Sequence, residues 1–152
     1  MEMVVTMNPI EDYQSAYLQR CQDTTVLHEG QRWLASMHWG GCTVECLLKA
    51  IVLSQIPNPE ERHWSTKEHP QPHGIKRPGH DLKQALQCHQ RLFHRAQQST
   101  IVMKWLNRVQ TPSQNFIDLR YEGQDPHETD YQEWWDAYNQ LREWLEQQKT
   151  QL

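Results

Sequence analysis

The segment ASMHWGGCTVECLLKAIVL, residues 35–53, constrains the fold more than any other part of the chain. Its apolar residues recur at the spacing of one helix face. They are Met37, Gly41, Val44, Leu48 and Ile51. Two features conflict with this helix, because Gly40 and Gly41 each cost a helix interior about 1 kcal/mol relative to alanine and Glu45 stands beside the apolar stripe, where a carboxylate needs a partner. The fold must therefore supply a reason for the paired glycines and a partner for the acid.

The rest of the chain is also helical in character, and no run of alternating β-branched residues predicts a sheet. Asn8-Pro9 is typical of a helix start, and Gly30 suits a left-handed helix end. Only FIDLRY, residues 116–121, could pass for a strand. The chain length fits one domain, which we place at residues 8–150, and we predict an all-α, up-and-down helical bundle of four to five helices. The expected helices cover about residues 9–29, 31–55, 80–97, 99–110 and 130–149.

A long loop is expected at residues 56–79, which carry five prolines and no period. Its His63, His69 and His73 raise the possibility of a metal site. Their spacing is irregular, and proline-rich chain does not hold a preformed site. We therefore predict a solvated, mobile loop and neither a metal nor a cofactor.

Composition limits the class of protein. The net charge of −4 argues against indiscriminate nucleic-acid binding. The start of the chain lacks the basic and apolar regions of a signal peptide, and no stretch approaches 18 consecutive apolar residues. These features predict a cytoplasmic protein with no membrane association. The cysteines lack zinc-binding spacing and are expected to be buried free thiols; they are Cys21, Cys42, Cys46 and Cys88.

Charge is unevenly distributed along the second half of the chain. Residues 74–110 carry seven basic side chains and one acid, a balance of +6, whereas residues 111–152 carry nine acids and three bases, a balance of −6. One interpretation is that helical layers of opposite charge pack side by side. The other is a basic face for phosphates, formed by one polar stripe of the predicted helix at 80–97.

Three short motifs together resemble the HEPN (higher eukaryotes and prokaryotes nucleotide-binding) domain family. They are Ala35-x4-Gly40-Gly41-x2-Val44-Glu45-Cys46-x-Leu48-Lys49-Ala50, then Gly79-His80-Asp81-Leu82, then Leu119-Arg120-Tyr121. The resemblance spans about residues 10–148. It implies that a polar residue of the second helix, here Glu45, faces an arginine, here Arg120, in a cleft that is typically at a dimer interface. An alternative, reached from the residues alone, is that Glu45 pairs with Lys49 one turn later, or with Arg120, only to fix the packing.

Many HEPN proteins are metal-independent endoribonucleases with an R-x4-6-H motif, and Arg120-x6-His127 has this spacing. A guanidinium can neutralise a phosphate through two hydrogen bonds, and an imidazole can move the proton of a 2′-hydroxyl. Gly123, Pro126 and Thr129 depart from the family pattern. Arg32-x5-His38 also has the spacing, but it falls in the second helix, where the family motif does not occur, and we attribute it to chance.

The sequence therefore predicts a HEPN-like nucleotide- or RNA-binding homodimer, with the possibility of metal-independent ribonuclease activity. The resemblance implies catalytic roles for Glu45, Arg120 and His127, and binding roles for the side chains Lys49, Tyr121 and His80. It also implies a toxin–antitoxin setting with a minimal nucleotidyltransferase as partner. The competing prediction is a non-catalytic helical module that docks on a nucleotidyltransferase or another protein through the Trp-rich last helix.

Overall fold

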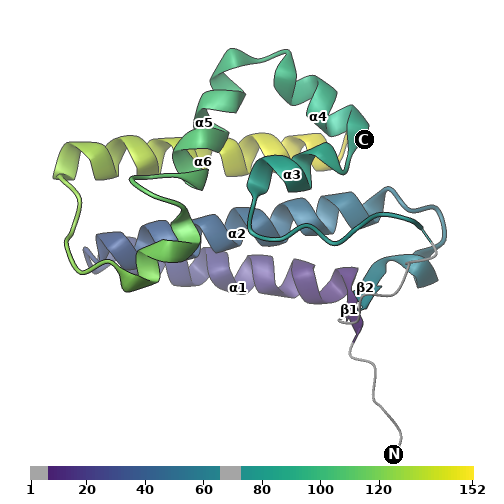
Figure 1. Ribbon diagram of the computed structural model, residues 1–152, viewed down its shortest axis with the longest axis horizontal. Helices are drawn as coiled ribbons and strands as arrows, with labels where there is room; N and C mark the ends of the chain where they lie inside the picture. The colour runs from purple at the N-terminus through teal and green to yellow at the C-terminus, as the bar shows by residue number, and fades with distance from the viewer. Residues whose placement is uncertain (1–6, 66–72) are drawn as a thin grey trace, which may run out of the picture.

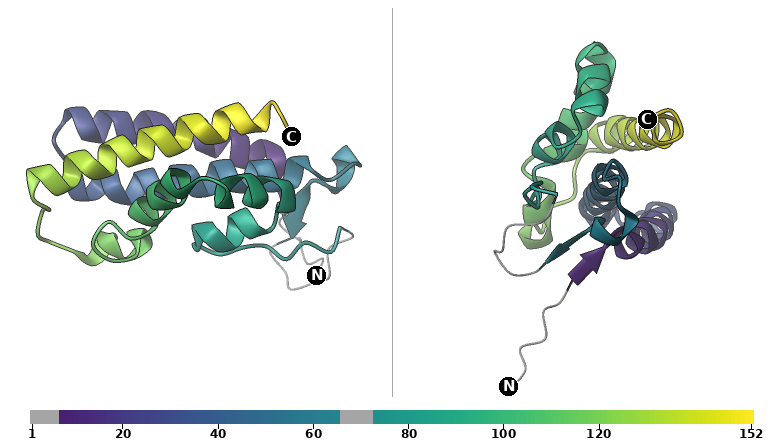
Figure 2. Two further views of the ribbon diagram at one scale, coloured as in Figure 1. Left: turned by 90° about the horizontal axis from the view of Figure 1, so that it is seen from above. Right: turned by 90° about the vertical axis from the view of Figure 1, so that its right-hand side faces the viewer.

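Three long helices give the molecule its elongated shape (Figure 1). The computed structural model describes residues 7–65 and 73–152. Helices α1 (Ile10–Glu29) and α2 (Trp33–Ser54) form an antiparallel hairpin, and α6 (Glu128–Lys149) packs against α2. Viewed from the end in Figure 2, the helices lie beside one another along their length. The predicted all-α class is confirmed for the described residues, apart from one small sheet.

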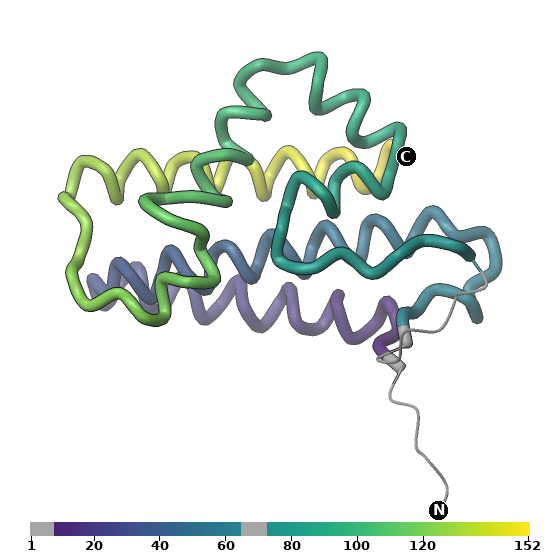
Figure 3. The backbone as a smooth tube through the Cα atoms, viewed as in Figure 1, coloured from purple at the N-terminus to yellow at the C-terminus, as the bar shows by residue number. Residues whose placement is uncertain are grey.

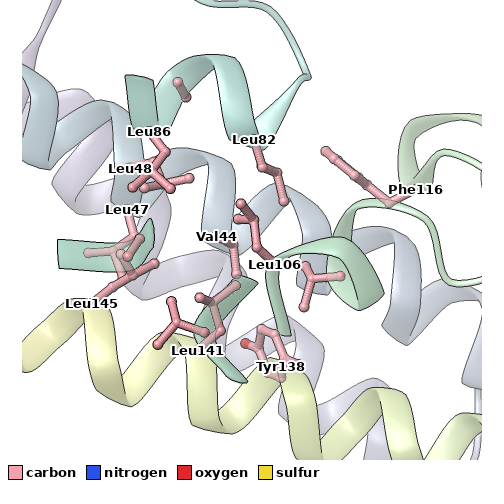
Figure 4. Close-up of a cluster of buried hydrophobic side chains, with 14 of the residues drawn as sticks. Val44, Leu47, Leu48, Leu82, Leu86, Leu106, Phe116, Tyr138, Leu141 and Leu145 are labelled. Atoms are coloured by element: carbon pink, nitrogen blue, oxygen red, sulfur yellow. The ribbon is translucent and has the colours of Figure 1, made fainter. Parts of the chain in front are cut away.

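The core lies between α2, α6 and a layer of shorter helices (Figure 4). Helical spacing places the apolar stripe of α2 on this side, where Val44 and Leu48 are fully buried against Leu106 and Leu141. Burying each such side chain contributes about 1.5–3 kcal/mol. The stripe predicted from residues 35–53 is therefore the central element of the core.

The shorter helices are α3 (Leu82–Gln87), α4 (Gln90–Gln97) and α5 (Thr100–Gln110). The prediction of one helix over 80–97 is wrong, because His89 leaves the helical region with φ −121° and ψ 97°. Its Nδ1 accepts the backbone N–H of Leu92 at 3.2 Å and so caps α4. A histidine thus does what serine or aspartate usually does at a helix start, and the polar stripe predicted for residues 80–97 is divided between two helices.

Stability should depend on the protonation of His89. Burial lowers the pKa of His89 below its usual 6.5, so the unfolded chain binds the proton more readily. The contribution of His89 to the free energy of unfolding is then fully present above pH 6.5. It is lost as the pH falls through the window between 6.5 and the lowered pKa. Urea unfolding at pH 7.5 should show a loss of about 1 kcal/mol for His89→Ala and little loss for His89→Asn, which keeps a capping acceptor. If His89→Asn shows the same acid sensitivity as the wild type between pH 7.5 and 5, His89 is not its source.

The predicted loop at 56–79 is more ordered in its described parts than expected. Strands β1 (Met7–Pro9) and β2 (His63–Ser65) pair antiparallel, with Asn8 opposite Trp64, and the short 3-10 helix η1 spans Pro59–Glu61. Trp64 is fully buried, and its indole N–H donates to the Ile75 carbonyl at 2.9 Å. Three-residue strands are too short for a periodic signal, which is why the sequence did not predict them.

One histidine of this loop, His73, is hydrogen-bonded to the backbone of another, His63. Nε2 of His73 bonds the His63 carbonyl at 2.9 Å, and its Nδ1 accepts the Ile75 N–H at 3.1 Å. Both nitrogens of His73 are therefore used within the loop itself. The third histidine, His69, lies outside the described residues.

Two predicted helix ends differ from the structure. Gly30 has φ −81°, and the left-handed conformation falls on Gln31, with φ 57°. The last helix begins at Glu128 rather than 130, and His127 is its N-cap without a side-chain hydrogen bond. Backbone contacts at the two turns decide these ends, and local side-chain preferences do not.

The opposite charges of the two halves of the chain meet in part, as the first interpretation predicted. Arg108 of α5 forms an ion pair with Glu133 of α6. Arg95 of α4 also contacts α6, but it donates to the neutral Gln148 side chain at 2.9 Å and makes no ion pair among the described residues. Within residues 7–65 and 73–152, no helix combines the length and the hydropathy needed to cross a membrane.

Candidate functional site

The paired glycines of α2 allow two aromatic rings to lie directly on the helix. A Cβ on Gly41 would be 2.2 Å from Cγ of Phe116, and a Cβ on Gly40 would be 2.5 Å from Cζ2 of Trp134. Both distances are far below van der Waals contact. The reason for the paired glycines is therefore the close approach of two ring side chains.

Phe116 begins the 3-10 helix η2 (Phe116–Tyr121), which lies on the first half of α2, as the chain trace in Figure 3 shows. The Asn115 side chain accepts the N–H of Ile117 at 3.2 Å and caps this helix. FIDLRY is therefore a 3-10 helix and not a strand. Its docking on Gly41 holds Arg120, near its end, beside the start of α2.

A pocket of about 720 Å³ opens between η2 and the start of α2. We call it the α2–η2 pocket. Its polar lining includes two guanidinium groups, from Arg32 and Arg120, together with His38 and Trp39. Leu34, Ala35 and Leu119 supply apolar wall. Two arginines, one imidazole and one indole thus share a single cavity that the sequence did not predict.

His38 has a defined tautomer in this pocket. Its Nδ1 lies 2.9 Å from the backbone carbonyl of Phe116. A carbonyl oxygen only accepts, so Nδ1 must carry the proton, and Nε2 of the neutral ring is left as the proton acceptor. Gly41 contributes indirectly, because it permits the position of Phe116 that fixes the ring.

The backbone at the mouth of the pocket is strained. Gln31 lines the pocket, and within the described residues it is the only non-glycine with positive φ. The left-handed conformation costs about 1–2 kcal/mol for a residue with a Cβ, and such strain concentrates at functional sites. The left-handed conformation of Gln31 turns the chain immediately before Arg32, and Arg32 forms part of the pocket wall.

Aromatic rings accompany two arginines near the pocket. The guanidinium of Arg120 lies 4.9 Å from the ring centroid of Tyr121, which is largely exposed. The guanidinium of Arg20, from α1, lies 5.1 Å from the ring centroid of Trp39. A cation–π contact orients a cation without neutralising it. Arg20 is also paired with Asp23 at 3.0 Å, whereas the guanidinium of Arg120 lines the pocket and stays available to an anion.

The pocket also contains two carboxylates, Glu122 and Asp125. Oε1 of Glu122 accepts the N–H groups of Gly123 and Gln124 at 3.0 and 3.1 Å, which ties it into the turn. Two acids balance two arginines, so the pocket is not a general polyanion surface. It suits a ligand that carries one phosphate and also hydrogen-bond donors.

Glu45 is not paired with Arg120, in contrast to the expectation from the family resemblance. Its carboxylate bonds Lys49 Nζ at 3.0 Å and His80 Nδ1 at 2.6 Å. Lys49 is buried, and His80 is more than half exposed at the head of α3. Lys49 reaches Glu45 along the same helix face, whereas η2 docks one turn earlier, at Gly41, and extends from there toward the α2–η2 pocket.

The predicted site residues thus fall into separate places. Glu45, Lys49 and His80 come together, which agrees with the packing alternative for Glu45. Arg120 lines the α2–η2 pocket, while His127 lines a neighbouring cavity of about 290 Å³. The two cavities share wall residues, but Arg120 and His127 do not line the same one.

The four cysteines are free and half-buried rather than buried as predicted. Burial raises the pKa of Cys42 to about 12 and that of Cys46 to about 11. A thiol with such a pKa is almost wholly protonated at neutral pH and is a poor nucleophile. Cys42 and Cys46 therefore do not supply nucleophilic chemistry.

Sequence reasoning missed Arg32, His38 and Trp39 as site residues. The signal for this pair is the ribonuclease spacing of Arg32-x5-His38, which local sequence does not distinguish from chance. The docking of η2 beside α2 brings Arg32 and His38 into one pocket with Arg120. Searches with protein-family models, among curated proteins and among solved structures gave no match to this chain.

Proposed function

We propose that this protein is a HEPN-like, RNA- or nucleotide-binding protein that holds a phosphate in the α2–η2 pocket between Arg32 and Arg120. The observation that carries the proposal is the meeting of both arginines with His38 in one cavity. Guanidinium groups bind phosphate oxygens through paired hydrogen bonds. The indole of Trp39 offers a ring face on which a base can stack.

The same pocket supports metal-independent RNA cleavage. Nε2 of His38 takes the proton of a ribose 2′-hydroxyl, the 2′-oxygen forms a bond to phosphorus, and the bond from phosphorus to the 5′-oxygen breaks. The departing 5′-oxygen takes a proton from water, and His38 later returns its proton to the solvent, so the products are a 2′,3′-cyclic phosphate and a 5′-hydroxyl. Arg32 and Arg120 stabilise the added negative charge at phosphorus. His38 therefore takes the role that the family resemblance implied for His127.

The family resemblance adds a cytoplasmic homodimer and a minimal nucleotidyltransferase partner to this proposal. The packing of two tryptophans argues against docking through all of the Trp-rich last helix. Trp134 is fully buried, and Trp135 stacks on His28 with ring centroids 3.6 Å apart. These rings hold α6 in the fold. They are not free for a partner without local unfolding.

The test combines cleavage and binding. Wild-type protein in EDTA should cleave single-stranded RNA, and His38→Ala should lower the rate at least 100-fold, in the range typical of a lost general base. His127→Ala is the matched control and should cleave like the wild type. Cleavage that is lost in His127→Ala and kept in His38→Ala would contradict the assignment.

Binding is measured separately with a 2′-O-methyl RNA, which cannot be cleaved by this route. Fluorescence anisotropy should show at least a tenfold weaker Kd for Arg120→Ala and for Arg32→Ala, since each removes a charge-assisted phosphate contact. His38→Ala should bind nearly as well as the wild type. If the wild type binds the 2′-O-methyl RNA but does not cleave RNA, the cleavage step is overturned and phosphate binding is retained. If the wild type does not bind, the proposed function is overturned.

A further inference from the structure

Helix α5 has an outward face that the core does not use. Val102, Leu106 and Val109 are buried against the rest of the fold. A second stripe follows at i, i+3, i+4 and i+7, a spacing that places its members on one face. Its members are Ile101, Lys104, Trp105 and Arg108. Ile101 is 50 % exposed and Trp105 is half-buried, so the face is apolar and basic together.

This face borders a groove of about 660 Å³. The groove lies where α5 packs against α6, and Figures 1 and 2 show how these two helices are arranged. We call it the α5–α6 groove. Ile101 and Trp105 from α5 and Ala137 from α6 form its apolar lining. The stripe from Ile101 to Arg108 covers about 10 Å of helix axis, at 1.5 Å per residue, which is enough for two turns of a bound helix.

The charges around the groove select the partner. Lys104 and Arg108 line it with a single acid, Glu133, and Glu133 is held in an ion pair by Arg108. No ion pair involves Lys104 within the described residues, and the groove therefore has one uncompensated positive charge. A ligand that complements it must place apolar side chains on Ile101 and Trp105 and an acid beside Lys104.

We propose that the α5–α6 groove binds an acidic amphipathic helix of a protein partner. Helices dock in such grooves by anchors at i, i+3, i+4 and i+7, which match the spacing of the stripe on α5. A nucleic acid fits less well, because Ile101, Trp105 and Ala137 would face its charged backbone, and Lys104 is the one cation of the groove lining without an ion pair in the described residues. The surface is separate from the α2–η2 pocket and does not depend on the proposed function.

The probe is a 16-residue amphipathic peptide with leucines at helical spacing and glutamates on the flanks, and its control replaces each glutamate with lysine. Isothermal titration with the full chain should give micromolar binding for the acidic peptide and none for the basic one. Ile101→Asp and Lys104→Glu should each weaken binding at least tenfold. Lys83→Glu, the same charge change on the exposed surface of α3, should leave it within twofold. Circular dichroism checks that every variant stays folded. Ile101 is substituted rather than Trp105 because Ile101 is exposed, whereas Trp105 is partly buried.

Equal binding of both peptides would show a non-specific apolar surface and overturn the proposal. So would binding that is insensitive to Ile101→Asp and Lys104→Glu, or no binding of the acidic peptide at 1 mM. A single-stranded RNA that displaces the peptide in a Lys104-dependent way would instead assign the groove to nucleic acid, and this too would overturn it.

Discussion

Gly41→Ala should destabilise the protein by about 2 kcal/mol, although alanine is the better helix former. The added Cβ would overlap the Phe116 ring at 2.2 Å, and that ring is fully buried. Forcing extra volume into a packed core typically costs about 1–3 kcal/mol and occasionally more. The better helix propensity of alanine returns only about 1 kcal/mol. Urea unfolding of the purified variant measures the difference.

A double-mutant cycle gives this prediction its control. Phe116→Ala removes the ring and leaves only its Cβ, 2.8 Å from the position of the added methyl group. Adding Gly41→Ala to Phe116→Ala should therefore cost clearly less than adding it to the wild type, because the helix propensity of alanine returns about 1 kcal/mol. Gly79→Ala is a matched control, because a Cβ there meets no atom within 4 Å. If Gly41→Ala costs the same with and without the Phe116 ring, the ring does not explain the glycine.

Lys49→Met should be similarly severe, with an expected loss of about 3 kcal/mol. Lys49 is buried and pairs with Glu45, whose side chain is also largely buried. Removing one member of a buried ion pair leaves the other charge without its partner, at a cost of about 3–5 kcal/mol. His80 remains bonded to Glu45 and offsets part of this cost. Thermal or urea unfolding at pH 7.5 provides the measurement.

The double variant Glu45→Gln with Lys49→Met separates the pair from packing. It removes both charges, so its loss should be clearly smaller than the sum of the two single losses. Strict additivity would mean that Glu45 and Lys49 act independently, in disagreement with their 3.0 Å contact.

The sequence predicted the helical class and the central position of α2, because the apolar spacing of residues 35–53 is long and regular. It did not predict the break at His89, because histidine is not a usual helix cap and only the fold shows that its ring accepts the Leu92 N–H. It also missed the β1–β2 pair, whose three-residue strands depend on the burial of Trp64. Periodic elements were thus readable, and short elements stabilised by distant contacts were not.

The same division holds for the candidate site. Arg120 was predicted from its motif and does line a pocket, and the contact of Glu45 with Lys49 followed from their spacing on one helix. The α2–η2 pocket itself was out of reach, since it depends on Phe116 lying on Gly41, 75 residues away in the sequence. His38 acquires its tautomer from that same contact. A site made by tertiary docking leaves little trace in local sequence.

The central claim is that a phosphate-bearing ligand occupies the α2–η2 pocket beside His38. Nitrogen-15 NMR of the histidine and tryptophan side chains during titration with a short 2′-O-methyl RNA tests it most directly. The account predicts saturable shifts of His38 Nε2 and the Trp39 indole, with His94 unchanged on the distant surface of α4. Shifts confined to His80, His94 or His127, with His38 and Trp39 unmoved at saturation, would contradict it.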